Sequence, residues 1–274
     1  ARRSVSPALR ADASDTTTDE FGCGSVVNPC NTIQGAIDVA HSGDTVLVVA
    51  GVYHERLRIN KNLWIEGDDR DTTIVDAEAT GRVVIVFGES SVTLVNLTFR
   101  NGRYADGAGV NVSQATAALV NVVVIGNTAM VEGGGLSNGF DSTLVLSRTQ
   151  VISNTALGTM GIGGRGGGII TLAGSTLTVE ESQIEDNRAL LGGGLYNVGA
   201  ADLARTGVAD NHAHTGGGIW SSGILARDHV VVSAIRGRNQ ARQGDNGKRE
   251  SKHGEISWNV KVDGSRLRRT EFSF

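Results

Sequence analysis

Three residues near the middle of this chain have the side-chain types that β-elimination requires. Arg100, Arg103 and Asp106 follow one another in one short polar stretch. Eliminating a proton beside a carboxylate needs a cation that neutralises the carboxylate and a base such as arginine that takes the proton. We therefore predict these three as catalytic candidates, although charged residues in turns are more often simply solvated. The candidate substrate-binding residues are Tyr104, Glu132, Asp141, Arg165 and Trp220.

A second cluster combines two histidines with an aromatic residue. His212 and His214 alternate in a short polar segment that Trp220 follows. Alternate residues of an extended segment share a face, so both imidazoles are predicted either to hold one metal ion or to flank a sugar ring stacked on the indole. No third ligand is evident, and a polar turn that carries two histidines is the commoner arrangement.

An acidic turn offers oxygen ligands for a harder cation. It contains Asp68, Asp69 and Asp71. Calcium prefers such ligands, but this spacing matches no calcium loop, and aspartates are frequent in ordinary turns. Calcium is therefore a candidate cofactor, with plain turn formation as the alternative.

The chain has two cysteines, Cys23 and Cys30, in one short glycine-containing loop. Two cysteines so placed most simply form a disulfide, which persists in oxidising compartments. The alternative, half of a metal site, lacks partners at the spacing of zinc ligands. We predict a disulfide and a secreted or cell-surface location.

A sequence motif that occurs four times indicates which structural elements position these residues. Each copy joins an Asn-x-Ala segment to three consecutive glycines and an aliphatic residue, and the copies begin at Asn127, Asn154, Asn187 and Asn211. The asparagines are 27, 33 and 24 residues apart (154−127, 187−154, 211−187). Self-similarity at such a period marks stacked supersecondary units. Each unit is long enough for three short strands with their turns and too short for a strand with a long helix.

Two columns of apolar residues precede the asparagines. They are Val124, Val151, Ile184 and Val208, and, further upstream, Leu119, Leu146, Val179 and Leu203. An earlier coil fits if Gly102 takes the asparagine position. Such columns predict parallel strands stacked around a shared interior. The recurring asparagine is then predicted to hydrogen-bond to the equivalent amide and to backbone in the next coil.

The two ends of the chain depart from this pattern. Residues 1–22 are predicted to be a flexible leader, and residues 32–40 have the apolar spacing of a short capping helix. After Gly223 the pattern fails, and residues 256–274 predict a hairpin that covers the end of the stack. An uncovered end would allow end-to-end self-association. The predicted boundaries are 1–30 for the leader and disulfide loop, 31–226 for the solenoid and 227–274 for a basic tail.

Charge limits the partners. Residues 1–226 contain 14 Lys/Arg and 23 Asp/Glu, a net charge of −9, and residues 227–274 contain 11 and 6, a net charge of +5. An acidic body is a poor electrostatic match for nucleic acid. No apolar run is long enough to span a membrane. We expect neither a nucleic-acid partner nor a membrane span.

Residues 31–76 resemble a known superfamily. Asn-Thr-Ile-Gln-Gly-Ala-Ile-Asp, Ser-Gly-Asp-Thr-Val-Leu-Val and Leu-Trp-Ile-Glu-Gly resemble the N-terminal cap and first coils of pectin-lyase-like right-handed parallel β-helix proteins. The triple-glycine coils are similar to repeats of bacterial secreted and cell-surface β-helix proteins. The resemblance implies an all-β, right-handed parallel β-helix with a short N-terminal capping helix. It implies less about function, because the superfamily contains lyases, hydrolases, esterases and adhesins.

The catalytic motifs of the enzyme branches have no counterpart in the sequence. The Asp-Phe-Ile-Phe-Gly segment of pectin methylesterases and the Trp-Ile-Asp-His segment of pectate lyases are both absent. The leading hypothesis is therefore a binding or structural module for polysaccharides or cell-surface glycans. The alternative is a carbohydrate-active enzyme, such as a polysaccharide lyase, that acts on an acidic polysaccharide.

Overall fold

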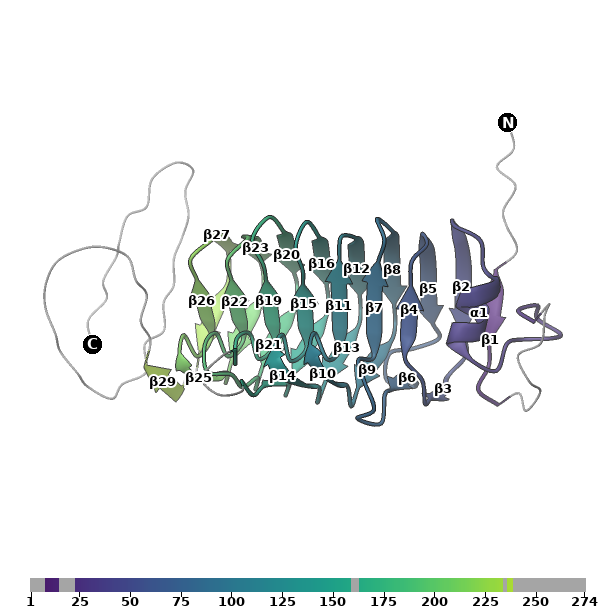
Figure 1. The fold of residues 1–274 in the computed structure, drawn as a ribbon, viewed down its shortest axis with the longest axis horizontal. Helices are drawn as coiled ribbons and strands as arrows, with labels where there is room; N and C mark the ends of the chain where they lie inside the picture. The colour runs from purple at the N-terminus through teal and green to yellow at the C-terminus, as the bar shows by residue number, and fades with distance from the viewer. Residues whose placement is uncertain (1–7, 15–22, 159–162, 234–235, 239–274) are drawn as a thin grey trace, which may run out of the picture.

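The computed structural model describes residues 8–14, 23–158, 163–233 and 236–238. Their strands wind into a right-handed parallel β-helix of about seven turns, which Figure 1 shows as neighbouring arrows along one long axis. The predicted all-β solenoid with a short N-terminal helix is confirmed.

Three parallel sheets form the walls of the solenoid. The nine-stranded sheet contains β1 (Leu9–Ala11), β2 (Asp44–Val48), β5 (Leu63–Gly67), β8 (Ser91–Val95), β12 (Thr116–Val120), β16 (Thr143–Ser147), β20 (Thr176–Glu180), β23 (Ala200–Ala204) and β27 (Ile224–Asp228). The seven-stranded sheet contains β4 (Leu57–Ile59), β7 (Val84–Phe87), β11 (Val110–Ser113), β15 (Leu136–Asn138), β19 (Ile169–Thr171), β22 (Leu195–Asn197) and β26 (Ile219–Ser221). The eight-stranded sheet contains β3 (Gly51–Tyr53), β6 (Thr73–Asp76), β9 (Thr98–Arg100), β13 (Val123–Ile125), β17 (Gln150–Ile152), β21 (Gln183–Glu185), β24 (Gly207–Ala209) and β28 (Val231–Ser233).

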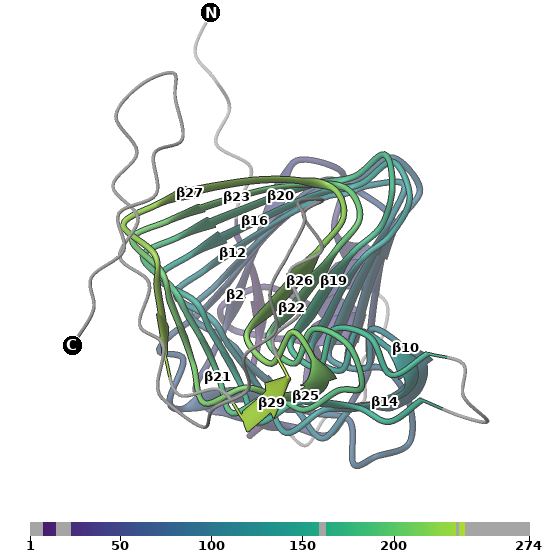
Figure 2. The same cartoon turned by 90° about the vertical axis from the view of Figure 1, so that its left-hand side faces the viewer.

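Extra strands form where the chain passes from the eight-stranded to the seven-stranded sheet. Figure 2, viewed along the axis, shows β10 and β14 projecting at this corner. One short sheet contains β10 (Arg103–Asp106), β14 (Thr128–Glu132) and β18 (Thr155–Ala156), and another contains β25 (His212–Thr215) and β29 (Arg236–Arg238). Several coils therefore have four strands rather than the three that we predict from the repeat length.

The strand register confirms the apolar columns. In the eight-stranded sheet Val124 pairs with Val151, Val151 with Ile184, and Ile184 with Val208. In the nine-stranded sheet the second column pairs in the same way, through Leu119, Leu146, Val179 and Leu203. All of these side chains are completely buried. Since burying one aliphatic side chain contributes about 1.5–3 kcal/mol, these columns are a main source of the solenoid's stability.

The repeated asparagines form the predicted ladder. Asn154 Oδ1 accepts from both the backbone N and the Nδ2 of Asn127, each 3.0 Å away. Asn154 Nδ2 in turn donates to the Val124 carbonyl at 2.9 Å and to Asn187 Oδ1 at 3.1 Å. Asn187 and Asn211 repeat this pattern, and all four asparagines are completely buried. The ladder thus satisfies side-chain and backbone groups that would otherwise be orphaned in the interior.

The triple glycines allow successive turns to approach closely. The first of the three, as at Gly133, has φ of +64°, in the left-handed region that favours glycine. A Cβ on the next residue, Gly134, would lie 2.4 Å from the carbonyl oxygen of Gly167 in the following coil. The backbones of successive coils are therefore so close at this position that only glycine fits.

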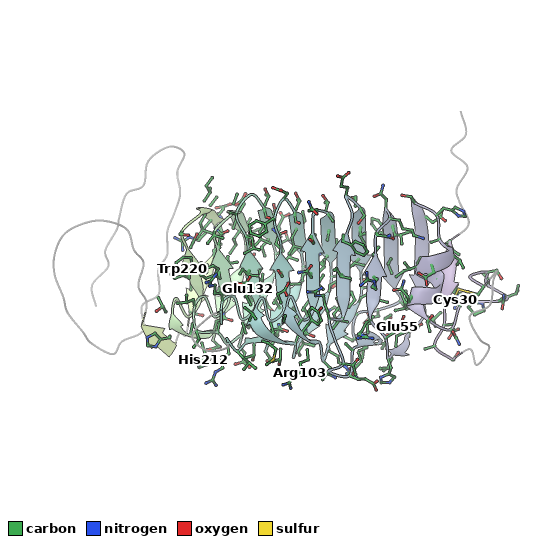
Figure 3. The ribbon with its side chains drawn as sticks, viewed as in Figure 1. Cys30, Glu55, Arg103, Glu132, His212 and Trp220 are labelled. Atoms are coloured by element: carbon green, nitrogen blue, oxygen red, sulfur yellow. A yellow bond between two sulfur atoms is a disulfide. The ribbon has the colours of Figure 1, made fainter. Side chains whose placement is uncertain are left out.

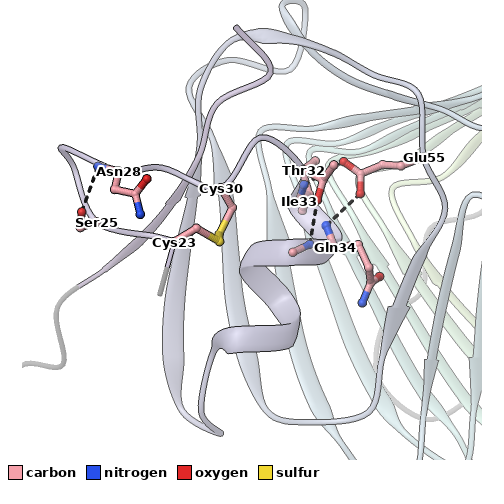
Figure 4. Close-up of a disulfide and its surroundings, with 9 residues drawn as sticks. Cys23, Ser25, Asn28, Cys30, Thr32, Ile33, Gln34 and Glu55 are labelled. Atoms are coloured by element: carbon pink, nitrogen blue, oxygen red, sulfur yellow. Dashed lines mark hydrogen bonds between the residues drawn. A yellow bond between two sulfur atoms is a disulfide. The ribbon is translucent and has the colours of Figure 1, made fainter. Parts of the chain in front are cut away.

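One short helix, α1 (Ile33–Val39), covers the N-terminal end of the core. Thr32 is its N-cap and accepts a bond from the Gly35 N–H at 2.9 Å. The Glu55 carboxylate accepts bonds from the N–H groups of Ile33 and Gln34, each at 2.8 Å (Figure 4). A carboxylate is favoured at a helix N-terminus, so Glu55 both caps the helix and ties it to the first coil. None of the described helices is long and apolar enough to cross a membrane.

Part of the predicted flexible leader belongs to the solenoid. β1 pairs in parallel with β2, and Ala11 within it is completely buried. The Tyr53 hydroxyl lies 3.2 Å from the Ala11 carbonyl, which it can reach as a donor. The predicted disulfide between Cys23 and Cys30 is present in the loop that follows (Figure 4). A three-residue strand gives too short a pattern to recognise, which is why the sequence did not indicate it.

The winding also continues past the expected boundary at residue 226. β27 and β28 pair with β23 and β24 and make a further coil. In this coil Arg227 is in register with Leu203, so the apolar column is interrupted and the repeat is hard to recognise. Ile224 in β27 is 73% exposed, which shows how little covers this coil among the described residues. The predicted hairpin at 256–274 lies outside the described residues.

Candidate functional site

Most predicted binding residues lie on the outer face of the seven-stranded sheet and at the corner beside it. The outward positions of this sheet, in register along the axis, are Arg58, Ile85, Asn111, Ser137, Ile170, Tyr196 and Trp220. The glycine turns fold over the middle of this column, since a Cβ on Gly133 would lie 2.8 Å from Ile170 Cγ2. Ser137 and Ile170 are therefore buried, while Arg58 and Trp220 at the two ends retain exposure.

A row of charged side chains runs along the corner, just before the glycine turns. Asp106 is in register with Glu132 on the next coil, and Glu132 with Arg165 on the coil after that. We call these three residues the corner row. Neighbouring parallel strands lie about 4.8 Å apart, so the three side chains are close enough to interact. The fold thus brings together three residues that the sequence separates by whole coils.

Arg82 holds the N-terminal end of the corner row. Its Nη2 lies 3.3 Å from Asp106 Oδ2, and its Nε and Nη2 donate to the carbonyl oxygen of Asp106. Its guanidinium also lies over the Tyr104 ring, 4.4 Å from the centroid. Burial lowers the pKa of Arg82, and the Asp106 carboxylate opposes that shift. Arg82 thus fixes both Asp106 and Tyr104, a bidentate and stacked role that suits arginine.

Glu132 and Arg165 form the centre of the site. Arg165 Nη1 lies 3.7 Å from Glu132 Oε2. Burial raises the pKa of the Glu132 carboxyl, Arg165 opposes the shift, and the neighbouring Asp106 adds to it. The Arg165 guanidinium lies 5.7 Å from the centroid of the Tyr196 ring. The charges of this pair are therefore balanced within the site, next to the buried Tyr196 ring.

Tyr196 and Trp220 form a stacked pair at the C-terminal end of the column. Their ring centroids are 4.3 Å apart and their planes differ by 3°. That separation is close to the strand spacing of about 4.8 Å, so the rings stack along the solenoid axis. β26 is the last described strand of its sheet, and one face of the indole therefore points past the end of the sheet. Figure 3 shows Trp220 and Glu132 on this side of the molecule.

The structure separates the predicted catalytic trio. Arg100 Nε donates to Asp76 Oδ2 at 2.7 Å, on the eight-stranded sheet. Arg103 lines a separate hollow of about 330 Å³ with Glu78 and Thr128. Only Asp106 belongs to the corner row. The chain turns a corner after Arg100, so Arg100 lies on the eight-stranded sheet, whereas Arg103 and Asp106 lie at the two ends of β10 in the short corner sheet.

Asp141 also lies away from the corner row. It occupies the turn between β15 and β16 with φ of +53°. That turn connects the seven-stranded sheet to the nine-stranded sheet, on the edge opposite the corner. Its predicted binding role therefore has no geometric link to Glu132 or Arg165.

The two histidines both lie on β25, whose pairing with β29 has a register irregularity between His212 and Thr215. Ala213 between them is buried, His212 is partly buried and His214 is exposed. In the described part of the chain no three His, Cys, Asp or Glu residues gather as a metal site, and this includes the turn with Asp68 and Asp69. Metal or calcium binding at either place stays a prediction.

Two site residues escaped prediction. Tyr196 follows its glycine triplet at the same distance as Trp220 follows the next one, so alignment of the repeats on their glycines would have found it. Arg82 belongs to a coil without a glycine triplet, and the sequence pattern does not indicate its contact with Asp106.

No family model matches the chain. A curated relative, the metabotropic glutamate receptor-like protein P of Dictyostelium discoideum, is 30% identical over 130 residues. The match covers 43% of this chain and 9% of that protein. The chain thus spans less than a tenth of the curated relative that it matches.

Several solved structures are similar in fold. A pectin methylesterase from Aspergillus niger has a TM-score of 0.47 at 13% identity, with 90% of this chain and 94% of that chain covered. A pectate lyase has a TM-score of 0.47 at 12% identity, with 86% and 79% covered. A pectin methylesterase from Erwinia chrysanthemi has a TM-score of 0.41 at 13% identity, with 78% and 80% covered.

Proposed function

We propose that this chain is a secreted or cell-surface module that binds a glycan along the corner row and the aromatic end of the seven-stranded sheet. The observation that carries the proposal is the stacked pair of Tyr196 and Trp220 beside the ion pair of Glu132 and Arg165. The disulfide supports the location, because such bonds persist in oxidising compartments.

The site combines the two surfaces that sugars require. An indole packs against the apolar C–H face of a pyranose, while fixed carboxylate and guanidinium groups hydrogen-bond to the hydroxyls around its rim. From β11, next to Asp106, to β26 with Trp220, the sheet spans four strand steps, or about 19 Å. That length suits several consecutive sugar units of a chain lying parallel to the solenoid axis.

Replacing the indole tests this proposal. A glycan array and affinity electrophoresis on neutral and acidic polysaccharides would identify binders, and isothermal titration calorimetry would measure them. We expect Trp220→Ala to weaken binding about tenfold or more, since aromatic anchors dominate such contacts.

Trp64 supplies the matched control. It is 44% exposed on β5, in the nine-stranded sheet, and its Nε1 donates to Glu66 Oε2. Trp64→Ala should leave glycan binding unchanged. Equal losses in the two variants, or no binding to any polysaccharide of the panel, would contradict the proposed function.

One observation favours a carbohydrate-active enzyme as the second candidate. Asp106 and Glu132 are two carboxyl groups on adjacent coils, and glycan cleavage commonly uses such a pair. The raised pKa of Glu132 suits a proton donor. Incubation with uronate and neutral polymers, with and without calcium, should then yield new reducing ends that Glu132→Gln abolishes. New double bonds would indicate elimination. If no polymer gave new reducing ends or double bonds, the result would count against catalysis.

A further inference from the structure

The charges at the aromatic end of the site are already paired. Arg165 lies beside Glu132 and over Tyr196, and its side chain is 41% exposed while that of Glu132 is 22% exposed. At the other end of the corner row Arg82 is held by Asp106 and stacked on Tyr104. The two arginines at the corner row therefore each already have a carboxylate.

The Glu132 carboxylate would repel a carboxylated sugar that approaches Arg165 at this end. To reach Arg165 its carboxylate must come next to Glu132 or displace it, and a displaced Glu132 would be a half-buried, unpaired charge. Residues 1–226 also carry a net charge of −9, which disfavours the approach of any polyanion.

The sheet has one arginine without a carboxylate partner among the described residues, and it is remote. Arg58 lies on β4 and its guanidinium is 5.3 Å from the centroid of the Phe87 ring. β4 is six strand steps from β26, or about 29 Å. An acidic group drawn to Arg58 would thus lie far from the indole.

We infer that the sugar units held between Glu132 and Trp220 are uncharged. This inference rests on the proposed glycan-binding function and names the ligand class for its aromatic end. Hydroxyl groups can donate to the Glu132 carboxylate and accept from the Arg165 guanidinium without separating the two, which a carboxylate cannot do.

Pairs of polymers that share a backbone and of which one member carries carboxylates test the inference. Suitable pairs are hydroxyethyl and carboxymethyl cellulose, methyl-esterified and de-esterified polygalacturonate, and propylene glycol alginate and alginate. Within whichever pair binds, we expect the uncharged member to bind at least about tenfold more tightly, with little dependence on salt. Equal binding, or tighter binding of the acid form that salt weakens, would overturn the inference and leave glycan binding intact. If no member of any pair and no glycan of the array bound, the proposed function itself would fail.

A change at Glu132 should weaken the expected preference. Glu132→Gln keeps the shape of the side chain and leaves Arg165 without its carboxylate. We expect the affinity for the acid member to rise at least about fivefold at low salt, while the affinity for the uncharged member falls, because an amide oxygen is a weaker acceptor for sugar hydroxyls than a carboxylate. Arg165→Gln is the matched control and should show no such gain. Unfolding curves would establish that both variants are folded, and an unchanged preference in folded Glu132→Gln would also refute the inference.

Discussion

Asn154→Ala should destabilise the protein by about 4 kcal/mol, because it breaks the ladder in the middle of the stack. The side chain is completely buried and takes part in bonds to Asn127, to Asn187 and to the Val124 carbonyl. Alanine fills the space incompletely, leaves the backbone N–H of Asn127 without its partner and removes the side-chain bond to the Val124 carbonyl. A buried polar group so orphaned costs about 1–3 kcal/mol. Urea unfolding followed by circular dichroism would show the lowered midpoint.

An amide pair on the surface gives the matched control. Gln150 Nε2 donates to Gln183 Oε1 at 3.2 Å between the same two coils, but in an exposed position. Water replaces that bond when Gln150→Ala removes it, so we expect a loss of less than about 0.5 kcal/mol. If the two alanine variants unfolded at the same urea concentration, the interior ladder would contribute no more than a surface pair, contrary to our interpretation.

The second large effect concerns the glycine turns. Gly167→Ala would place a Cβ 2.5 Å from the Arg188 carbonyl oxygen and 2.6 Å from that of Gly193. Both oxygens already accept backbone bonds, from Ala156 and Gly168 respectively, so neither can move without breaking the stack. We expect a loss of more than about 3 kcal/mol or failure to fold. The yield of folded protein and its thermal unfolding midpoint would measure this.

Gly207 provides the contrast. It lies in β24, has no heavy atom within 4 Å of its hypothetical Cβ, and does not have the left-handed backbone of the turn glycines. Gly207→Ala should be neutral or stabilise by up to about 1 kcal/mol, because alanine restricts the unfolded chain. A similar loss in both variants would show that steric approach of the coils is not what requires glycine at residue 167.

The sequence was sufficient for the repeated part of the fold because its constraints recur. Asn127, Asn154 and Asn187 fix the register, and the valine and isoleucine column before them fixes which face points inward. Pairing follows, since a slip of one residue would expose a whole column. The strand at Leu9–Ala11 and the coil containing Arg227 lacked that redundancy, and each was recognised only in the structure.

The site was predicted less completely because it is assembled across coils. Glu132, Arg165 and Trp220 were identified by residue type, but their proximity depends on lateral register, which composition does not reveal. Grouping Arg100 with Asp106 relied on closeness in sequence at a place where the chain changes direction. The spacing from the glycine triplets indicates Tyr196, whereas the contact of Arg82 with Asp106 arises only in the folded chain.

The unequal lengths of the coils have a consequence for how such a protein can change. Asn154 and Asn187 are 33 residues apart and Asn187 and Asn211 are 24 apart. The corresponding bonds from backbone N to Oδ1 are nevertheless both 2.9 Å. The asparagine ladder therefore sets the axial spacing of the coils. This spacing does not depend on the number of residues between one asparagine and the next. Insertions at residues 157–165, whose far end is Arg165, can alter what the protein recognises while the scaffold keeps its dimensions.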